Sequence, residues 1–299
     1  MAASAQVSPI TNAMSVDVED YFQVQALESV FGRSDWDACE SRVEQNTARL
    51  LDLFAETDVK ATFFTLGWIA ERNPRLVRRI ADAGHEVASH GYQHARVDSQ
   101  TEAEFRADVR KAREILQDAS GAAVSGYRAA TFSVGPRTPW AWRVLEEEGY
   151  RYSSSVYPVK RDLYGMPDAP RSPYRPAGTA DFVEIPISTV RLAGRNWPGG
   201  GGGWFRLLPY GVSRGLIERI NRADRAPAIF YLHPWEVDPD QPRPGGLSAK
   251  SRFRHYVNLE RTHGRLARLA RAFRWDRMDR VFKIGQQDHA ASLPPYAVA

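Results

Sequence analysis

The sequence lacks the features that mark several classes of protein. Cys39 is the only cysteine among 299 residues, so no intramolecular disulfide can form, which fits a reducing compartment. No apolar run approaches the roughly 18 residues that a membrane-spanning helix needs. Residues 1–13 lack a basic stretch followed by an apolar one, so we expect no signal peptide and a cytoplasmic location. Zinc-finger spacings are also missing, which argues against nucleic-acid binding.

The composition that is present is typical of a globular α/β protein. Hydrophobic residues make up 43% of the chain and charged residues 25%, and the net charge is +4. Short apolar segments alternate with segments of helical periodicity, which indicates a β/α architecture. We expect strands at 13–18, 59–66, 85–89, near 127, 182–188 and 228–232, and helices at 41–56, 74–83, 101–117, 139–148, 209–221 and 258–273.

This order predicts a single-domain (β/α) barrel with long loops and a C-terminal helical extension. The barrel would span 13–240 and the extension, packed on it, 241–285. Residues 1–12 and 286–299 are expected to be flexible. The stretches 157–179 and 195–203 lack a regular pattern, and loops of such length are usually functional. Five consecutive glycines in the second stretch allow either a mobile lid or a close backbone approach.

His90 and His94 give the sharpest local signal for chemistry. Their four-residue spacing would place both imidazoles on one face of a helical turn, within reach of a single cation. They follow a predicted strand, at the end where the active sites of barrels gather. Two polar loop histidines without a ligand role would show the same spacing, so the pair alone leaves both interpretations open.

Three acids, Asp17, Glu19 and Asp20, end the first predicted strand. Strand alternation sends Asp17 and Glu19 to the same side, and carboxylates so close repel one another unless a cation offsets them. Combined with the histidine pair, they suggest a site of two histidines and one carboxylate with positions open for water and substrate. Capping of the following helix is the alternative role for these acids.

Two further residues stand at predicted strand ends. His233 follows the apolar run 229–232, and a histidine there can serve as a general acid because its unperturbed pKa lies near neutrality. Arg128 follows Gly126 and Tyr127 and can hold a catalytic carboxylate by a bidentate pair. Taken singly, the histidine could equally be a core residue and the arginine one of many.

In their order along the chain, these residues resemble a known family. Asp17, Glu19, the run GHEVASHGYQH at 84–94, the GYR at 126–128 and the LHP at 232–234 resemble the polysaccharide deacetylase (NodB-homology, carbohydrate esterase 4) family over roughly residues 15–236. The runs SVDVEDYF, GGGWFRLLPY and RFRHYVNLERT resemble the branch associated with exosortase-linked exopolysaccharide gene clusters. The resemblance implies a distorted (β/α) barrel of about seven strands, the NodB type.

The resemblance also implies a role for each matching residue. Asp17 would be the catalytic base, steadied by Arg128, and His233 the general acid. His90 and His94 would bind the metal ion together with an acidic ligand, Glu19 or Asp20. The family's commonest first motif has adjacent aspartates, whereas an acid-x-acid subgroup favours Glu19 here. Asp20 stays open as the alternative.

The chain departs from the family pattern at two other places. Arg128 is followed by Ala129-Ala130-Thr131 instead of x-Pro-Tyr, so part of the predicted groove wall differs. Ser153 or Ser154 stands where many members carry an acid, which leaves the partner of the general acid unidentified. Aromatic faces stack on pyranose rings, and we expect Trp204, Trp235 and Tyr92 to contact substrate.

The predicted function is therefore metal-dependent removal of N-acetyl groups from an N-acetylhexosamine-containing polysaccharide or oligosaccharide, free or lipid-linked, in exopolysaccharide biosynthesis. Zn²⁺ suits the ligand set best, and Co²⁺, Fe²⁺, Ni²⁺ or Mn²⁺ also fit it. An allantoinase-like hydrolase of a small cyclic amide and a non-catalytic carbohydrate-binding protein are the alternatives. A glycosidase with paired carboxylates is disfavoured, because it would leave the histidine pair without a role. The sequence predicts no oligomeric state.

Overall fold

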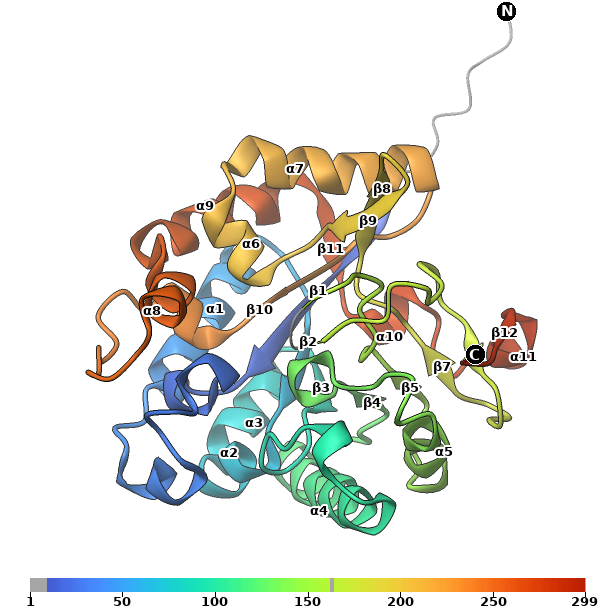
Figure 1. The fold of residues 1–299 in the computed structure, drawn as a ribbon, viewed down its shortest axis with the longest axis horizontal. Helices are drawn as coiled ribbons and strands as arrows, with labels where there is room; N and C mark the ends of the chain where they lie inside the picture. The colour runs from blue at the N-terminus through green and yellow to red at the C-terminus, as the bar shows by residue number, and fades with distance from the viewer. Residues whose placement is uncertain (1–9, 162–163, 299) are drawn as a thin grey trace, which may run out of the picture.

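A curled parallel sheet with helices around its outside forms the centre of the computed structural model, which describes residues 10–161 and 164–298 (Figure 1). The strand order is β10-β1-β2-β3-β4-β5-β7, and every one of these neighbouring pairs is parallel. Among the described residues the end strands β10 and β7 do not pair, so the barrel is distorted and open on one side. This confirms the predicted fold class.

The elements have the following bounds. The strands are β1 (Thr11–Val18), β2 (Thr62–Thr65), β3 (Glu86–Ser89), β4 (Gly126–Tyr127), β5 (Tyr152–Ser153), β6 (Arg175–Pro176), β7 (Val183–Glu184), β8 (Thr189–Leu192), β9 (Arg195–Pro198), β10 (Ile229–Leu232), β11 (Arg274–Asp276) and β12 (Pro295–Tyr296). The α-helices are α1 (Val43–Glu56), α2 (Gly67–Arg72), α3 (Pro74–Asp82), α4 (Glu102–Ser120), α5 (Trp140–Glu147), α6 (Gly202–Leu207), α7 (Tyr210–Arg219), α8 (Ala249–Tyr256), α9 (Leu259–Ala272), α10 (Met278–Val281) and α11 (His289–Ser292). Short 3-10 turns include η1 (Tyr21–Gln23) and η7 (Pro234–Val237).

Local signals set several of these boundaries as predicted. Thr101 caps α4, where its hydroxyl accepts from the backbone N–H of Glu104 and the Glu104 carboxylate accepts from the N–H of Thr101. Gly121 ends the helix in the left-handed conformation, with φ of 68°. Pro74 stands at the first residue of α3.

The stretch 195–203, which we predicted to be irregular, contains β9 and the start of α6. A hairpin forms from β8 and β9 because Ala193 and Gly194 both adopt positive φ, as a two-residue hairpin turn requires. The glycines that follow lie against β10: a Cβ atom at Gly200 would stand 2.1 Å from the carbonyl oxygen of Ile229, and one at Gly201 1.9 Å from that of Tyr231. The glycine run therefore serves close backbone approach.

Alternating strand residues separate two buried layers. Met14, Val16 and Val18 belong to the larger hydrophobic cluster, which also holds the buried residues of α1, α3 and α4. Ala13 belongs to the smaller cluster, which also includes Phe64, Tyr152 and Tyr231. Because side chains alternate along a strand, Asp17 shares the face of Ala13 and points into the barrel. The Asp17 carboxylate therefore lies on the inner face of the sheet, near the carboxyl end of β1.

The C-terminal part of the chain returns to the sheet. Strand β11 pairs with Thr11–Ala13 at the beginning of β1, and β12 pairs with β6. Of the N-terminal residues 1–12 that we expected to be flexible, only 10–12 are among the described residues. The predicted division into barrel, extension and flexible ends stays a prediction. Within the described ranges, no helix has both the length and the apolar character needed to cross a bilayer.

Candidate active site

The carboxyl ends of four strands on one side of the sheet, β10, β1, β3 and β4, bring the predicted site residues together. Asp17 is paired in register with Phe64 at the end of β1, and the adjacent pair Val16 and Leu232 places the end of β10 beside it. The residues that follow β3, β4 and β10 are His90, Arg128 and His233. Since parallel strands end at one edge, segments more than 200 positions apart contribute to one site.

A cluster of three potential metal ligands lies at this edge. One ligand atom each from Glu19, His90 and His94 lies within 4.8 Å of the others. Glu19 Oε2 is buried and accepts no hydrogen bond, yet it stands 2.9 Å from His94 Nε2. Two atoms with lone pairs can face each other so closely only if a proton or a metal ion lies between them. This orphaned oxygen makes the cluster fit a divalent cation.

The second ring nitrogen of His90 supports the same interpretation. Its Nδ1–H donates to the backbone carbonyl of Arg128 at 2.8 Å, which leaves the lone pair on Nε2. Burial lowers the pKa of His90 to about 4, so the ring is neutral at pH 7 and can act as a ligand. Burial would raise the pKa of Glu19, but the imidazoles of His94 and His233 outweigh it and lower the pKa to about 2.

The loop that carries the two histidines is not the helical turn that their spacing predicts. Gly91 and His94 both adopt positive φ, 77° and 56°, which turns the chain tightly and brings the two imidazole centroids to 5.2 Å. Asp108 of α4 holds this loop by accepting the N–H of Tyr92 at 2.9 Å. A Cβ atom at position 91 would stand 2.8 Å from that carboxylate, so only glycine fits.

The structure distinguishes the two acids that the sequence left open. Asp20 is not in the ligand cluster, because its carboxylate caps helices instead. One oxygen accepts from the N–H of Tyr21, and the other accepts from the Ser41 hydroxyl and from the N–H groups of Arg42 and Val43 at the start of α1. Asp20 thus takes the capping role, and Glu19 is the acid that faces the two histidines.

Asp17 and Arg128 form a buried ion pair beside the cluster. Arg128 Nη1 donates to Asp17 Oδ1 at 2.6 Å and to the hydroxyl of Ser15 at 2.9 Å. Its Nε donates to the carbonyl of Ser154, and its guanidinium lies 4.1 Å from the ring centre of Phe64. The arginine is fully buried, so its charge holds one carboxylate oxygen in a fixed direction and leaves Oδ2 to face His233.

His233 lies between two sets of carboxylates. Its Nδ1–H donates to Glu236 Oε1 at 2.7 Å, while Nε2 stands 3.3 Å from Glu19 Oε1 and 3.9 Å from Asp17 Oδ2. The other oxygen of Glu236 accepts from Arg206 at 2.6 Å. Burial would lower the pKa of His233, but the surrounding carboxylates raise it to about 9, so the ring carries a proton at neutral pH.

Sequence reasoning missed Glu236 and Arg206. The partner acid was sought near Ser153 and Ser154, but Ser154 contacts Arg128 and Ser153 contacts the buried Glu184. Burial would raise the pKa of Glu236, and Arg206 and His233 lower it below its usual range. The available signal was the three-residue spacing from His233, where the Glu236 carboxylate also accepts the N–H of residue 233 as an N-terminal capping box does.

The three predicted substrate-contacting aromatic residues have different surroundings. Trp235 is buried, and its ring stacks between His233 and His255 at 5.2 and 4.3 Å, so both faces are covered and the predicted stacking on sugar is wrong for this ring. Tyr92 donates its hydroxyl to Glu71, and Lys111 lies 3.5 Å above its ring, so its contacts are with α2 and α4 instead of the site.

The third aromatic residue, Trp204 of α6, is half-buried. The guanidinium of Arg161 lies 4.8 Å from its ring centre, and this arginine lines two neighbouring pockets of the surface. Among the three aromatic residues, Trp204 is the one that contacts a residue lining a surface pocket. Its role in substrate binding stays a prediction.

Fold and site together place the chain among barrel proteins with a carboxylate–histidine site at the carboxyl ends of the strands. Residues 35–153 match the family described as polysaccharide deacetylase, and residues 154–283 match a domain of unknown function (DUF3473). The chain thus contains a polysaccharide deacetylase domain of the NodB-homology, carbohydrate esterase 4 type. Both matched regions contribute strands to the one sheet, and His233 lies in the second.

Curated relatives match the chain over short regions. A peptidoglycan-N-acetylglucosamine deacetylase of Bacillus cereus is 42% identical over 25% of this chain and 27% of its own length. A peptidoglycan deacetylase of Helicobacter pylori is 32% identical over 38% of each chain. A chitooligosaccharide deacetylase of Sinorhizobium fredii is 48% identical over 16% of this chain and 22% of its own. This chain therefore matches well under half of each relative's length.

Solved structures share the fold over nearly the whole chain. A Pseudomonas aeruginosa protein designated a polysaccharide deacetylase superposes with a TM-score of 0.57 at 20% identity, covering 91% of this chain and 89% of its own. A Mycobacterium smegmatis protein with the same designation gives 0.52 at 22% identity, covering 90% and 95%. Identities this low establish the common fold alone.

Proposed function

We propose that this protein hydrolyses the N-acetyl groups of an N-acetylhexosamine-containing saccharide with the help of a divalent cation, releasing acetate. The observation that carries the proposal is the orphaned oxygen of Glu19 facing His94, next to an aspartate that Arg128 fixes and a protonated His233. The names of the matched relatives, which act on peptidoglycan and chitooligosaccharides, support the same substrate class.

Glu19, His90 and His94 would hold the cation. Bound there, it would polarise the acetyl oxygen and lower the pKa of a bound water, which is the chemistry that a divalent ion supplies to amide hydrolysis. Two imidazoles and one carboxylate suit Zn²⁺, and Co²⁺, Fe²⁺, Ni²⁺ and Mn²⁺ accept the same ligands.

Asp17 would act as the base. Arg128 and its hydrogen bonds fix one carboxylate oxygen, so Oδ2 is the oxygen that can take a proton from the attacking water. The water oxygen forms a bond with the acetyl carbon while its proton passes to Asp17. Because the carboxylate cannot rotate away from Arg128, the proton acceptor is oriented before the substrate arrives.

His233 would act as the acid. Its proton would pass to the sugar nitrogen as the bond between that nitrogen and the acetyl carbon breaks, giving acetate and a free amine. Glu236 accepts the Nδ1–H of the ring and leaves Nε2 directed toward Asp17 and Glu19. Glu236 is a positioning residue, because it acts through the histidine and touches no site ligand directly.

Acetate release from chitooligosaccharides and from peptidoglycan fragments, before and after chelation and Zn²⁺ or Co²⁺ addition, tests the proposal. Activity should disappear with the chelator and return with metal. Asp17→Asn should retain metal and lose activity, since an amide cannot accept the proton. Ring opening of a small cyclic amide without acetate release would support the allantoinase-like alternative. Metal-loaded protein that binds oligosaccharide but never releases acetate would make it a binding protein.

The biological setting is part of the proposal. The exosortase-associated sequence runs support a role in exopolysaccharide biosynthesis, with a free or lipid-linked saccharide as substrate. The single cysteine is compatible with a cytoplasmic location. Cell fractionation with an antibody against the protein tests the location, and recovery of the protein in a periplasmic or extracellular fraction would contradict it.

A further inference from the structure

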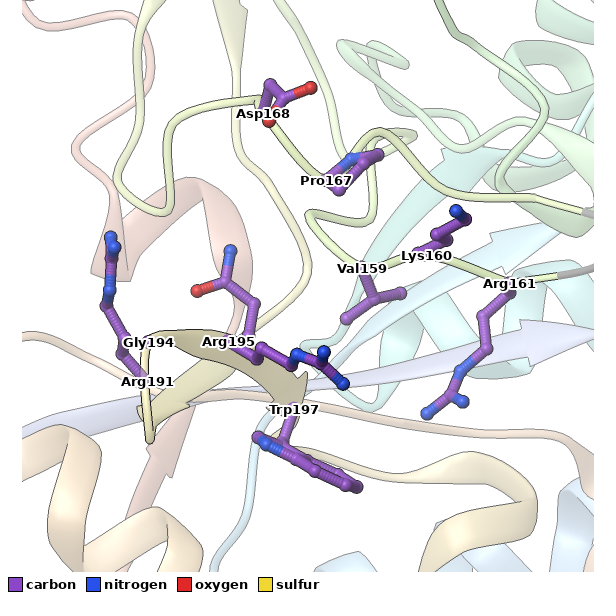
Figure 2. Close-up of a pocket in the computed structure, with 10 residues that line it drawn as sticks. Val159, Lys160, Arg161, Pro167, Asp168, Arg191, Gly194, Arg195 and Trp197 are labelled. Carbon is purple, nitrogen blue, oxygen red and sulfur yellow. The ribbon is translucent and has the colours of Figure 1, made fainter.

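A basic groove of about 780 Å³ lies between residues 159–161 and 167–168 on one side and the β8–β9 hairpin on the other, outside the cluster of site residues (Figure 2). None of the roles assigned above uses it. The residues that give the groove its chemical character are Lys160, Arg161, Asp168, Arg191, Arg195 and Trp197.

The charge of this groove is unbalanced. It contains four cationic side chains and one carboxylate, Asp168. Many arginines elsewhere in the chain are paired with acids, but in the described residues no ion pair involves any of the four groove cations. The Nε of Arg161 is even buried without a hydrogen-bond partner. Cations that outnumber the carboxylates beside them repel one another and attract an anionic ligand.

Aromatic surface accompanies the charge. The Trp197 side chain is 48% exposed, which is unusual for a tryptophan in a protein with a large core, and its indole lines the groove. Figure 2 shows the side chains of Arg161 and Arg195 entering the groove from opposite walls above Trp197. An indole face packs against a pyranose ring, while guanidinium groups bind carboxylate or phosphate oxygens in pairs.

Arg161 connects the groove to the neighbourhood of the active site. It also lines a second, smaller pocket that includes Phe132. The ring centre of Phe132 lies 5.1 Å from that of Tyr231 and 5.9 Å from the guanidinium carbon of Arg128. Tyr231 precedes His233 by two residues. A chain of sugar residues leading away from the acetamide can therefore follow this line of pockets to the basic groove.

We propose that the groove binds a negatively charged group of the saccharide substrate, carried by a carboxylate or phosphate on a sugar near the N-acetylated one. This inference rests on the proposed deacetylation, and it restricts the substrate class to anionic saccharides. The concave shape and the exposed indole favour a saccharide over a flat lipid surface, which would meet cations on a convex face.

Three N-acetylated probes distinguish the possibilities: a neutral chitotetraose, an oligosaccharide alternating N-acetylglucosamine with glucuronate, and an N-acetylglucosamine oligosaccharide that ends in a diphosphate. Acetate release and calorimetric binding are measured for each with the wild-type protein. The proposal expects kcat/KM for at least one anionic probe to exceed that for chitotetraose about tenfold or more, with the preference falling as salt rises. The anionic probe with the higher kcat/KM identifies carboxylate or phosphate as the source of the charge.

The variant R191E/R195E reverses two exposed charges on the hairpin without touching the core. It should lower kcat/KM for the preferred anionic probe by about tenfold or more and leave that for chitotetraose within about twofold. The matched control R75E/R78E changes two exposed arginines of α3 by the same net charge and should leave both substrates unaffected. A loss in the control variant as well would mean that net charge, not the groove, attracts the substrate.

Two outcomes would overturn the inference while leaving the deacetylase proposal intact: equal kcat/KM on neutral and anionic probes, or an anionic preference that survives R191E/R195E. Binding to anionic vesicles that this variant abolishes, without any saccharide preference, would assign the groove to a membrane surface and also overturn it. If no probe releases acetate, the proposed function fails. The calorimetric arm then decides on the groove by itself, because tight anionic binding lost in R191E/R195E would still support it.

Discussion

Replacement of Arg128 by methionine tests how the site is held together. The substitution keeps most of the volume but removes a fully buried cation that donates to Asp17, Ser15 and the carbonyl of Ser154. The carboxylate of Asp17, only 3% exposed, would then be buried without its partner. Removing one partner of a buried pair costs about 3–5 kcal/mol, so Arg128→Met should lower the free energy of unfolding by that amount.

The double variant gives the sharper measurement. Asp17→Asn combined with Arg128→Met removes both charges, so no uncompensated ion remains. The sum of the two single losses should exceed the loss in the double variant by about 3 kcal/mol. Unfolding in urea followed by tryptophan fluorescence gives each value, with a chelator present so that metal affinity does not contribute.

Arg49 provides the matched control. It also faces a buried carboxylate, Asp238, at 3.7 Å, but Asp238 keeps its bonds to Arg42 and Asn46. Arg49→Met should therefore cost less than about 1 kcal/mol. The reasoning is refuted if Arg128→Met costs as little as the control, or if the two single losses at positions 17 and 128 simply add.

Three further changes test other parts of the site and fold. Glu236→Gln should lower kcat about 10- to 100-fold with little change in KM, because His233, the proposed general acid, loses the carboxylate that positions it. Steady-state kinetics on an acetylated oligosaccharide measures the effect, and an unchanged kcat would contradict the role. Glu19→Gln should lose metal, measured by elemental analysis. Asp20→Ala should keep the metal and lose about 1–2 kcal/mol of stability, because the cap of α1 is removed. The reverse pattern would return the ligand role to Asp20. Burial, with Asp279 nearby, raises the pKa of Glu86 from 4.5 to about 8, so the folded state binds its proton more tightly than the unfolded chain. The resulting stabilisation is complete below about pH 4.5 and is lost as the pH rises through 8. Glu86→Gln should therefore flatten the decline in melting temperature between pH 5 and 9. An unchanged decline would exclude Glu86 as its cause.

The sequence predicted most of the barrel because its signals are local. Thr101 and Glu104 mark a helix start, Gly121 marks its end, and the apolar runs before Asp17 and His233 mark strands. Such signals depend on residues within a few positions of one another. The β8–β9 hairpin was not predicted, because its turn consists of Ala193 and Gly194. The recognisable turn sequences have asparagine or aspartate before the glycine.

The site was predictable as a set of residues but not as a geometry. The spacing of His90 and His94 suggested a helix, whereas two left-handed residues make a tight loop. The choice between Glu19 and Asp20 depended on where the N–H groups at the start of α1 lie, which local sequence does not specify. For the same reason Trp235 resembled a sugar platform, although the side chain of His255, contributed by α8, covers its second face.

The position of β1 has a consequence for how the protein is made. Its partner β2 follows soon after it along the chain, but Ser15 hydrogen-bonds to the carbonyl of Phe230, 215 positions later, and β11 comes later still. During synthesis the first strand therefore leaves the ribosome long before the strands that complete its pairing, and its hydrogen-bonding edge stays open for that time. Pairing at such sequence separation is slow, so we expect the approach of Asp17 and His233, the proposed base and acid, to be among the last events of folding.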